Sequence, residues 1–279
     1  MAHRTENILK QKQMKLKLPD GLSMYYEHHF IDDSKYTLVF LNGLSQSTLS
    51  WFPIVQVLKN QFNIVLIDQI FQGQSDQKGE YRSFEQHAAD VHQVLEKINA
   101  KRVVPVGISY GGAVAMRLLV NYPQNIEKAV LISTFANRTP YFDFIGTSWR
   151  RALLVGGYEL MLDVMLPAVL GQEYFFRPLI PIQDIQNARL QNKITSDSLM
   201  KLMDATENSN DYREKLKSVT VPVKVIHGKQ DILTTPQMGQ NIVDALPNAE
   251  LKLLSKKGHT LNLEAIPELI TEIESFLNV

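Results

Sequence analysis

Ser109 lies in the pentapeptide Gly-Ile-Ser-Tyr-Gly, with one glycine two residues before it and another two residues after it. A serine hydroxyl can attack an acyl carbonyl, but it needs a base within hydrogen-bond reach to do so efficiently. A nucleophile presented between a strand and a helix requires a sharp turn whose neighbours carry almost no side chain. Gly107 and Gly111 meet that requirement, and Gly112 lets the helix pack closely. The pattern predicts a serine nucleophile on a strained corner.

The helix expected directly after Ser109 adds an electrostatic contribution. The first backbone N–H groups of a helix have no acceptor within it, and the positive end of the helix dipole lies there. Negative charge that develops on a substrate oxygen in front of the serine would be stabilised by these donors.

Seven histidines compete for the role of base. His259 follows the last apolar strand in a loop, where an imidazole can reach over the serine. His227 lies inside a strand, and we expect it to be a hydrogen-bonded core residue. The others occupy positions that suit neither a base nor a metal pair: His3 near the start, His28 and His29 in an early strand expected at the sheet edge, and His87 and His92 on different faces of a helix. We therefore predict that His259 is the base.

The acid that orients the base is expected between Ser109 and His259 in the chain. Asp231 comes three residues after Gly228, at the end of the preceding strand. The strand that ends near residue 134 carries no acid. Five other aspartates of this stretch lie in helical segments or connectors: Asp163, Asp184, Asp197, Asp204 and Asp211. Asp231 is the predicted acid.

Composition limits the classes of function. The chain has 279 residues, of which 44% are hydrophobic, so it can bury a large core. Lysine plus arginine (29) equal aspartate plus glutamate (29), which argues against nucleic acid or an anionic membrane as partner. There is no cysteine, which excludes disulfides, thiolate metal ligands and a cysteine nucleophile. We expect a small-molecule partner, no metal or other cofactor and, since no secretory signal is visible, a cytoplasmic location.

Short apolar runs alternate with helical stretches along most of the chain. Residues 14–19 and 23–30 are expected to form an antiparallel pair. Apolar strands are expected at 36–42, 63–68, 102–109, 128–134 and 221–228, a last strand begins near 249, and helices are expected at 49–60, 83–98, 112–122, 236–246 and 267–277. This alternation predicts a doubly wound α/β fold with a mostly parallel, eight-stranded sheet.

Residues 136–216 interrupt this alternation with consecutive helical segments. We interpret them as a helical lid above the carboxyl ends of the strands, where ligands bind, with residues 1–135 and 217–279 forming the core. The most apolar stretch, 153–170, carries Glu159 and Asp163 on one helical face and is interrupted by a Gly-Gly pair. It is therefore expected to be an amphipathic lid helix, and the chain is not expected to be an integral membrane protein.

Five motifs in order resemble the α/β-hydrolase superfamily, over nearly the whole chain. They are NGLSQS after the third strand, DQIFQGQSD at 68–76, GISYGG at the serine, GKQD at the acid and GHTLNLEAIP at the histidine. The resemblance implies a Ser109–Asp231–His259 triad and an oxyanion hole made by the N–H groups of Leu44 and Tyr110. Two departures stand out: Asn42-Gly43 replaces a common His-Gly, and Phe71-Gln72 replaces a common Gly-His.

Three functions stay open at this point. The first is hydrolysis of carboxylic esters with small or medium-chain apolar acyl groups, through an acyl-enzyme. A looser resemblance to the acyltransferases of rhamnolipid biosynthesis implies the second, transfer of a 3-hydroxyacyl group from an acyl carrier protein thioester to a hydroxyl acceptor. The third is a non-catalytic protein that binds a hydrophobic ligand or signal.

The expected substrate-binding residues are Asn42, Gly43, Phe142 and Trp149. Other apolar lid residues could add to an acyl pocket or simply form lid core: Tyr141, Phe144, Met161 and Met165.

Overall fold

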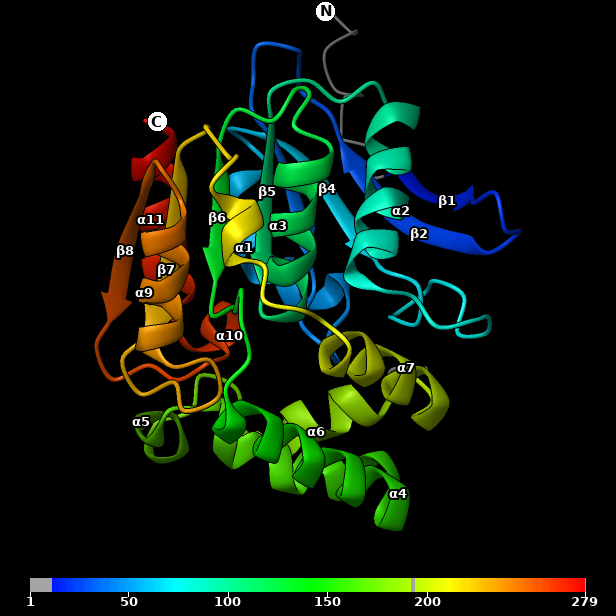
Figure 1. The fold of residues 1–279 in the computed structure, drawn as a ribbon, viewed down its shortest axis with the longest axis vertical. Coiled ribbons are helices and arrows are strands. Elements are labelled where there is room, and N and C mark those ends of the chain that lie inside the picture. Colours follow the sequence, from blue (N-terminus) through cyan, green and yellow to red (C-terminus); the bar gives the residue numbers. More distant parts are fainter. Residues whose placement is uncertain (1–11, 192–193, 279) are drawn as a thin grey trace, which may run out of the picture.

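A computed structural model describes residues 12–191 and 194–278; residues 1–11, which include His3, lie outside the described part. The described chain forms one eight-stranded sheet in the order β1-β2-β4-β3-β5-β6-β7-β8 (Figure 1). The strands are β1 (Lys12–Lys17), β2 (Ser23–His29), β3 (Thr37–Leu41), β4 (Asn63–Asp68), β5 (Val103–Ile108), β6 (Ala129–Ile132), β7 (Val223–Gly228) and β8 (Ala249–Leu254). The pairs β1·β2 and β2·β4 are antiparallel and the rest are parallel, which confirms the predicted fold class.

One expectation about the sheet edge is wrong. Strand β2 lies between β1 and β4, so that β1 takes the edge. The reason is that residues 12–17 pair in register along most of β2. His29 is consequently buried.

Helices cover both faces of the sheet, which explains why strands β3 to β7 are buried at every position. One face packs against α2 (Phe84–Lys97), α3 (Tyr110–Asn121) and α9 (Pro236–Ala245). The other packs against α1 (Phe52–Leu58) and α11 (Ile266–Leu277). The short helices η1 (Thr48–Trp51) and α10 (Leu261–Glu264) lie in the loops after β3 and β8.

Five helices separate β6 from β7: α4 (Pro140–Val169), α5 (Gln172–Phe176), α6 (Ile182–Gln191), α7 (Ser196–Glu207) and α8 (Arg213–Leu216). Figure 1 shows α4 to α7 grouped beyond the end of the sheet toward which the arrowheads of β6 and β8 point. We call α4 to α7 the lid. They occupy the segment in which the sequence predicts one, and the division into two domains stays a prediction.

Helix α4 is long and apolar enough to cross a membrane by length and composition alone. It is nevertheless broken in the middle, because Gly156 and Gly157 have non-helical backbone angles and Gly157 takes a φ of +67°, which favours glycine. Its second half buries one face against the rest of the protein, at Met161, Leu162, Met165, Leu166 and Val169. The two halves are therefore lid helices, each with one buried face. The expected amphipathic pattern is incomplete, because the outer face also carries exposed apolar side chains, among them Phe144, Leu154 and Val155.

The corner predicted at Ser109 lies between the end of β5 and the start of α3. Ser109 takes a φ of +53°, a left-handed conformation that costs free energy in a residue with a side chain. A Cβ added to Gly107 would lie 2.4 Å from the carbonyl oxygen of Gly111, and one added to Gly111 would lie 2.2 Å from the carbonyl oxygen of Leu41. Both approaches are to backbone atoms that cannot move aside. The two glycines are therefore required for α3 to pack this closely on β5 and β3.

We predict that Gly111→Ala lowers the free energy of unfolding by about 3 kcal/mol or more, because the methyl group overlaps the backbone of β3. The matched control is Gly146→Ala in α4, where an added Cβ meets nothing within 4 Å. This variant should be as stable as the parent or up to about 1 kcal/mol more stable, since alanine favours a helix. Urea denaturation followed by circular dichroism measures both. Equal stability of the two variants would contradict the packing argument.

Candidate active site

The backbone of Ser109 is held by hydrogen bonds on both sides of the corner. Its N–H donates to the carbonyl of Ile132 (2.9 Å), and its carbonyl accepts from Thr134 Oγ1 (2.7 Å) and from the N–H groups of Gly112 (3.0 Å) and Ala113 (3.1 Å). These bonds offset the cost of the left-handed conformation. The corner is fixed, and the Ser109 residue lines the cavities between core and lid.

The predicted acid and base are in direct contact. His259 Nδ1 lies 2.8 Å from Asp231 Oδ2, and the Asp231 side chain is fully buried. The other carboxylate oxygen, Oδ1, accepts from the N–H groups of Leu233 and Thr234, both at 2.9 Å. A carboxylate only accepts hydrogen bonds, so His259 Nδ1 donates to Oδ2 and Nε2 is left as the acceptor of the ring.

Thr234 is a further residue of the site, and the sequence does not predict it. Its Oγ1 lies 2.8 Å from Asp231 Oδ2 and 3.0 Å from His259 Nδ1, so it contacts both partners of the pair. His227, fully buried as expected, approaches the carbonyl of Thr234 with Nδ1 (3.1 Å) and accepts from the N–H of Thr134 with Nε2. Burial lowers the pKa of His227 to about 4, so it is neutral and supports Thr234 from behind.

Ser109 shares one cavity with His259 and a neighbouring one with Tyr110, and Leu44 lines both. Tyr110 is the first residue of α3, so its N–H has no acceptor within the helix. The structure therefore brings Ser109, His259, Leu44 and Tyr110 to the same place, as the sequence predicts.

Asn42 lines neither of the cavities that contain Ser109, which corrects its predicted contact with the substrate. It is completely buried, its Nδ2 donates to the carbonyl of Ile67 (2.9 Å) and to Asp68 Oδ1 (3.1 Å), and its Oδ1 accepts from Trp51 Nε1 (3.0 Å). Both polar atoms of the side chain are thus used behind the loop. Asn42 supports the segment that carries Gly43 and Leu44.

The second departure from the family pattern, Gln72, belongs to the same support. Its Nε2 donates to the carbonyl of Gly43 at 2.9 Å. Asp68 accepts from the N–H of Thr48 (2.7 Å) and of Gln74 (2.8 Å), and burial raises its pKa to about 6. Gly43 itself lines the cavity that contains Ser109 and His259.

Two adjoining cavities meet at Ser109. The first, with an empty volume of about 540 Å³ including its open mouth, is largely apolar, and its lining includes Phe135, Phe142, Trp149 and Met203. Phe142 and Trp149 thus line a cavity at Ser109, and their role in substrate binding stays a prediction. Tyr141 and Phe144 are 57% and 71% exposed, because they lie on the outer face of α4, and Met161 is buried in the lid. These three do not line the first cavity.

The second cavity, with an empty volume of about 370 Å³, is lined by residues of the loop after β3, by His259 and by the lid residues Met165 and Arg189. In the part of the chain that the structure describes, no group of three or more histidine, aspartate or glutamate side chains is arranged to hold a metal ion.

The family model for the alpha/beta hydrolase fold matches residues 36–266, and the chain belongs to this family. It is 26% identical over 268 residues to the uncharacterized hydrolase YugF of Bacillus subtilis, covering 91% of this chain and 93% of that protein. At this coarse level, the prediction of a hydrolase is confirmed.

Two solved structures show how closely the fold is shared. The alpha/beta hydrolase MGS-M2 from a Medee basin deep-sea metagenome library superposes with a TM-score of 0.88 at 22% identity, over 95% of this chain and 98% of that one. An esterase from Thermogutta terrifontis superposes with a TM-score of 0.83 at 17% identity, over 96% and 98% of the two chains.

We predict that Asp231→Asn slows the labelling of Ser109 by a fluorophosphonate probe by several orders of magnitude. The amide oxygen can still accept from Leu233 and Thr234, but the NH₂ group then faces His259 Nδ1 and forces the wrong tautomer. The same change in a serine protease costs about 10⁴ in kcat. Asp244→Asn, at an exposed position of α9, is the matched control and should label at the parental rate. If Asp231→Asn also labels at the parental rate, Asp231 is not the orienting acid.

Proposed function

We propose that the protein hydrolyses carboxylic esters with a medium-chain apolar acyl group through an acyl-enzyme on Ser109. The observation that carries this proposal is the meeting, in one cavity, of a serine on a strained corner with a histidine hydrogen-bonded to a buried carboxylate. The proposal agrees with membership of the alpha/beta hydrolase fold family.

The chemistry follows from this arrangement. Ser109 Oγ attacks the ester carbonyl carbon while His259 Nε2 accepts the hydroxyl proton. Asp231 holds the imidazole tautomer and stabilises the imidazolium. The oxyanion of the tetrahedral intermediate accepts hydrogen bonds from the N–H groups of Leu44 and Tyr110.

Collapse of the intermediate breaks the ester C–O bond, and His259 returns its proton to the departing alcohol. Water then attacks the acyl-enzyme with His259 again as base, and the acid product leaves with Ser109 Oγ protonated. No redox step occurs, and each proton taken by His259 is given back.

The first cavity provides the acyl specificity. Its apolar lining, which includes Phe135, Phe142 and Met203, lies beside Ser109. Each buried methylene group contributes roughly 0.8 kcal/mol, so several together favour a longer chain over acetyl.

Acyl transfer is the second candidate, and the burial of the site under the lid favours it. His259 is buried, and lid residues line the cavity it shares with Ser109. A hydroxyl acceptor competes with water at about 55 M only where water is excluded and the acceptor is held close. For acyl transfer, the donor is a thioester carried by an acyl carrier protein. An added alcohol then serves as the acyl acceptor and raises the total turnover.

We predict that kcat/KM for p-nitrophenyl esters rises from acetyl to octanoyl in the parent protein. Gly146 lines the apolar cavity, and Gly146→Leu should fill it and shift the preference toward acetyl by about tenfold relative to octanoyl. The matched control, Thr147→Leu, places the same side chain at the next, exposed position of α4 and should keep the parental profile. A flat or falling profile in the parent would leave a small-ester hydrolase as the better account.

A further inference from the structure

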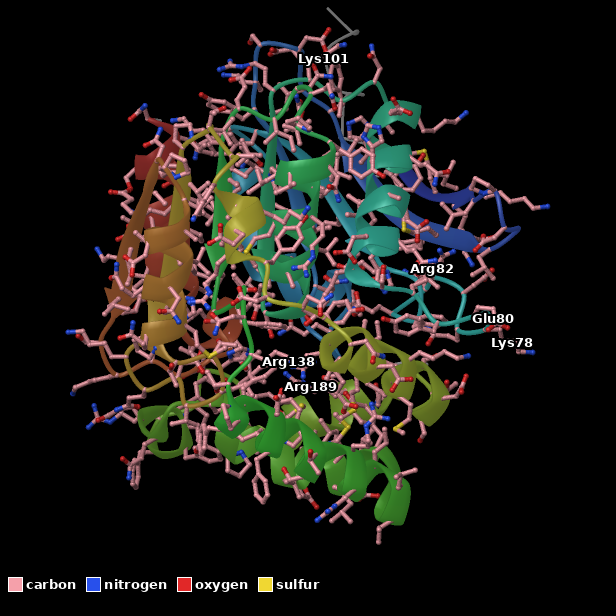
Figure 2. The ribbon with its side chains drawn as sticks, in the orientation of Figure 1. Lys78, Glu80, Arg82, Lys101, Arg138 and Arg189 are labelled. Atoms are coloured by element: carbon pink, nitrogen blue, oxygen red, sulfur yellow. The ribbon has the colours of Figure 1, made fainter. Side chains whose placement is uncertain are left out.

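Arg189 on lid helix α6 is a cation without a counter-ion at the active site. It lines the same cavity as Ser109 and His259, and Figure 2 shows it where the lid faces the sheet. Its hydrogen-bond partner within the described residues is Ser45 Oγ, at 3.4 Å from Nη1. Among those residues no carboxylate forms an ion pair with it, although Asp184 and Arg189 both line a third cavity. The Arg189 side chain is half-buried and has no counter-ion there, so its guanidinium is available to an anionic ligand.

Two other half-buried arginines in or beside the lid are paired. Arg150 pairs with Asp204 (2.7 Å) and Glu207 (2.8 Å), and Arg138 pairs with Asp143 (2.9 Å). The unpaired arginines Arg151 and Arg177 are exposed to solvent. Within the described lid, Arg189 is the half-buried arginine that no carboxylate neutralises.

Ser45 and Arg189 are the polar groups that the second cavity offers on this side. Arg189 Nη1 donates to Ser45 Oγ at 3.4 Å, and both residues line the cavity. Tyr158 on α4 lies behind them: it lines neither cavity at Ser109, and its buried hydroxyl interacts with Ser45, which opposes the rise that burial causes in the pKa of Tyr158. The Arg189 guanidinium and the Ser45 hydroxyl thus form one cluster of hydrogen-bond donors at the second cavity.

The position of this cluster divides the active site into two parts. Ser45 and Arg189 line the second cavity but not the first, whereas Phe142 and Met203 line the first but not the second. Ser109 lines both. A substrate that reacts at Ser109 can therefore place an apolar part on one side and an anionic part on the other.

We propose that Arg189, together with Ser45, binds a carboxylate carried by the substrate, so that the enzyme prefers an anionic ester to a neutral ester of the same length. A planar guanidinium matches a carboxylate in a two-bond geometry, and the Ser45 hydroxyl can donate to a remaining lone pair. The inference rests on the proposed ester hydrolysis at Ser109 and names the class of substrate: an ester with an apolar acyl group, which occupies the first cavity, and an alcohol that carries a carboxylate, which occupies the second.

The test compares octanoyl esters of the ω-hydroxy acids from glycolate to 6-hydroxyhexanoate with octanoyl esters of the corresponding neutral ω-hydroxy amides, and release of octanoate is followed by NMR. At the best spacer length, we expect kcat/KM for the carboxylate to exceed that for the amide by at least about tenfold. Arg189→Met should abolish this preference, and Arg189→Lys should keep part of it. The matched control is Arg151→Met, at an exposed arginine of α4, which should retain the full preference.

A preference for the neutral amide at every length in the parent, or an undiminished preference for the carboxylate in Arg189→Met, would overturn the inference. If Arg189→Met does not fold, Ser45→Ala replaces it and should reduce the preference. Failure of ester hydrolysis is distinguished by isothermal titration of Ser109→Ala. There, tighter binding of the carboxylate than of the amide that is lost with Arg189→Met supports the anion site without the proposed reaction, and equal binding of the two refutes it.

Discussion

The structure depends on the close approach of helix α3 to strands β5 and β3 at Ser109. A left-handed serine between strand and helix is stable only because Gly107 and Gly111 leave room for neighbouring backbone and because Ile132, Thr134, Gly112 and Ala113 bond the serine backbone. This approach places the serine at a cavity beyond the carboxyl end of the sheet. It also places the N–H of Tyr110 beside the serine. Any side chain at Gly107 or Gly111 would separate these elements.

The remaining groups are supported from behind by buried polar networks. Asp231 is fixed by the backbone of Leu233 and Thr234, and the threonine is in turn bonded to neutral His227. On the other side of the site, Asn42 and Gln72 support the loop of Gly43 from the interior. Each network uses nearly all its polar atoms internally, which leaves few groups free to bind a ligand. Arg189 differs in this respect, since no carboxylate pairs with it within the described residues.

The sequence predicts the sheet well because its signals are local. Buried strands read as apolar runs, and the predicted 63–68 coincides with β4 (Asn63–Asp68). Glycines and chain order likewise lead to Ser109, Asp231 and His259. The misses depend on orientation: spacing cannot tell that Asn42 turns inward or that Tyr141 and Phe144 face outward. The sequence does not predict the positions of Thr234 and Arg189, because each contacts a residue that is distant in the chain: His259 for the threonine and Ser45 for the arginine. A local signal exists for Thr234 alone, which lies three residues after Asp231.

The central claim is that Ser109 becomes acylated during turnover, and intact-protein and peptide mass spectrometry of an acid-quenched reaction tests it most directly. With p-nitrophenyl butyrate in excess, the account predicts a protein heavier by one butyryl group, located on the peptide that contains Ser109 and lost in Ser109→Ala. Release of p-nitrophenol with an acyl group on another residue would contradict the account, and so would folded protein that neither hydrolyses the ester nor gains mass.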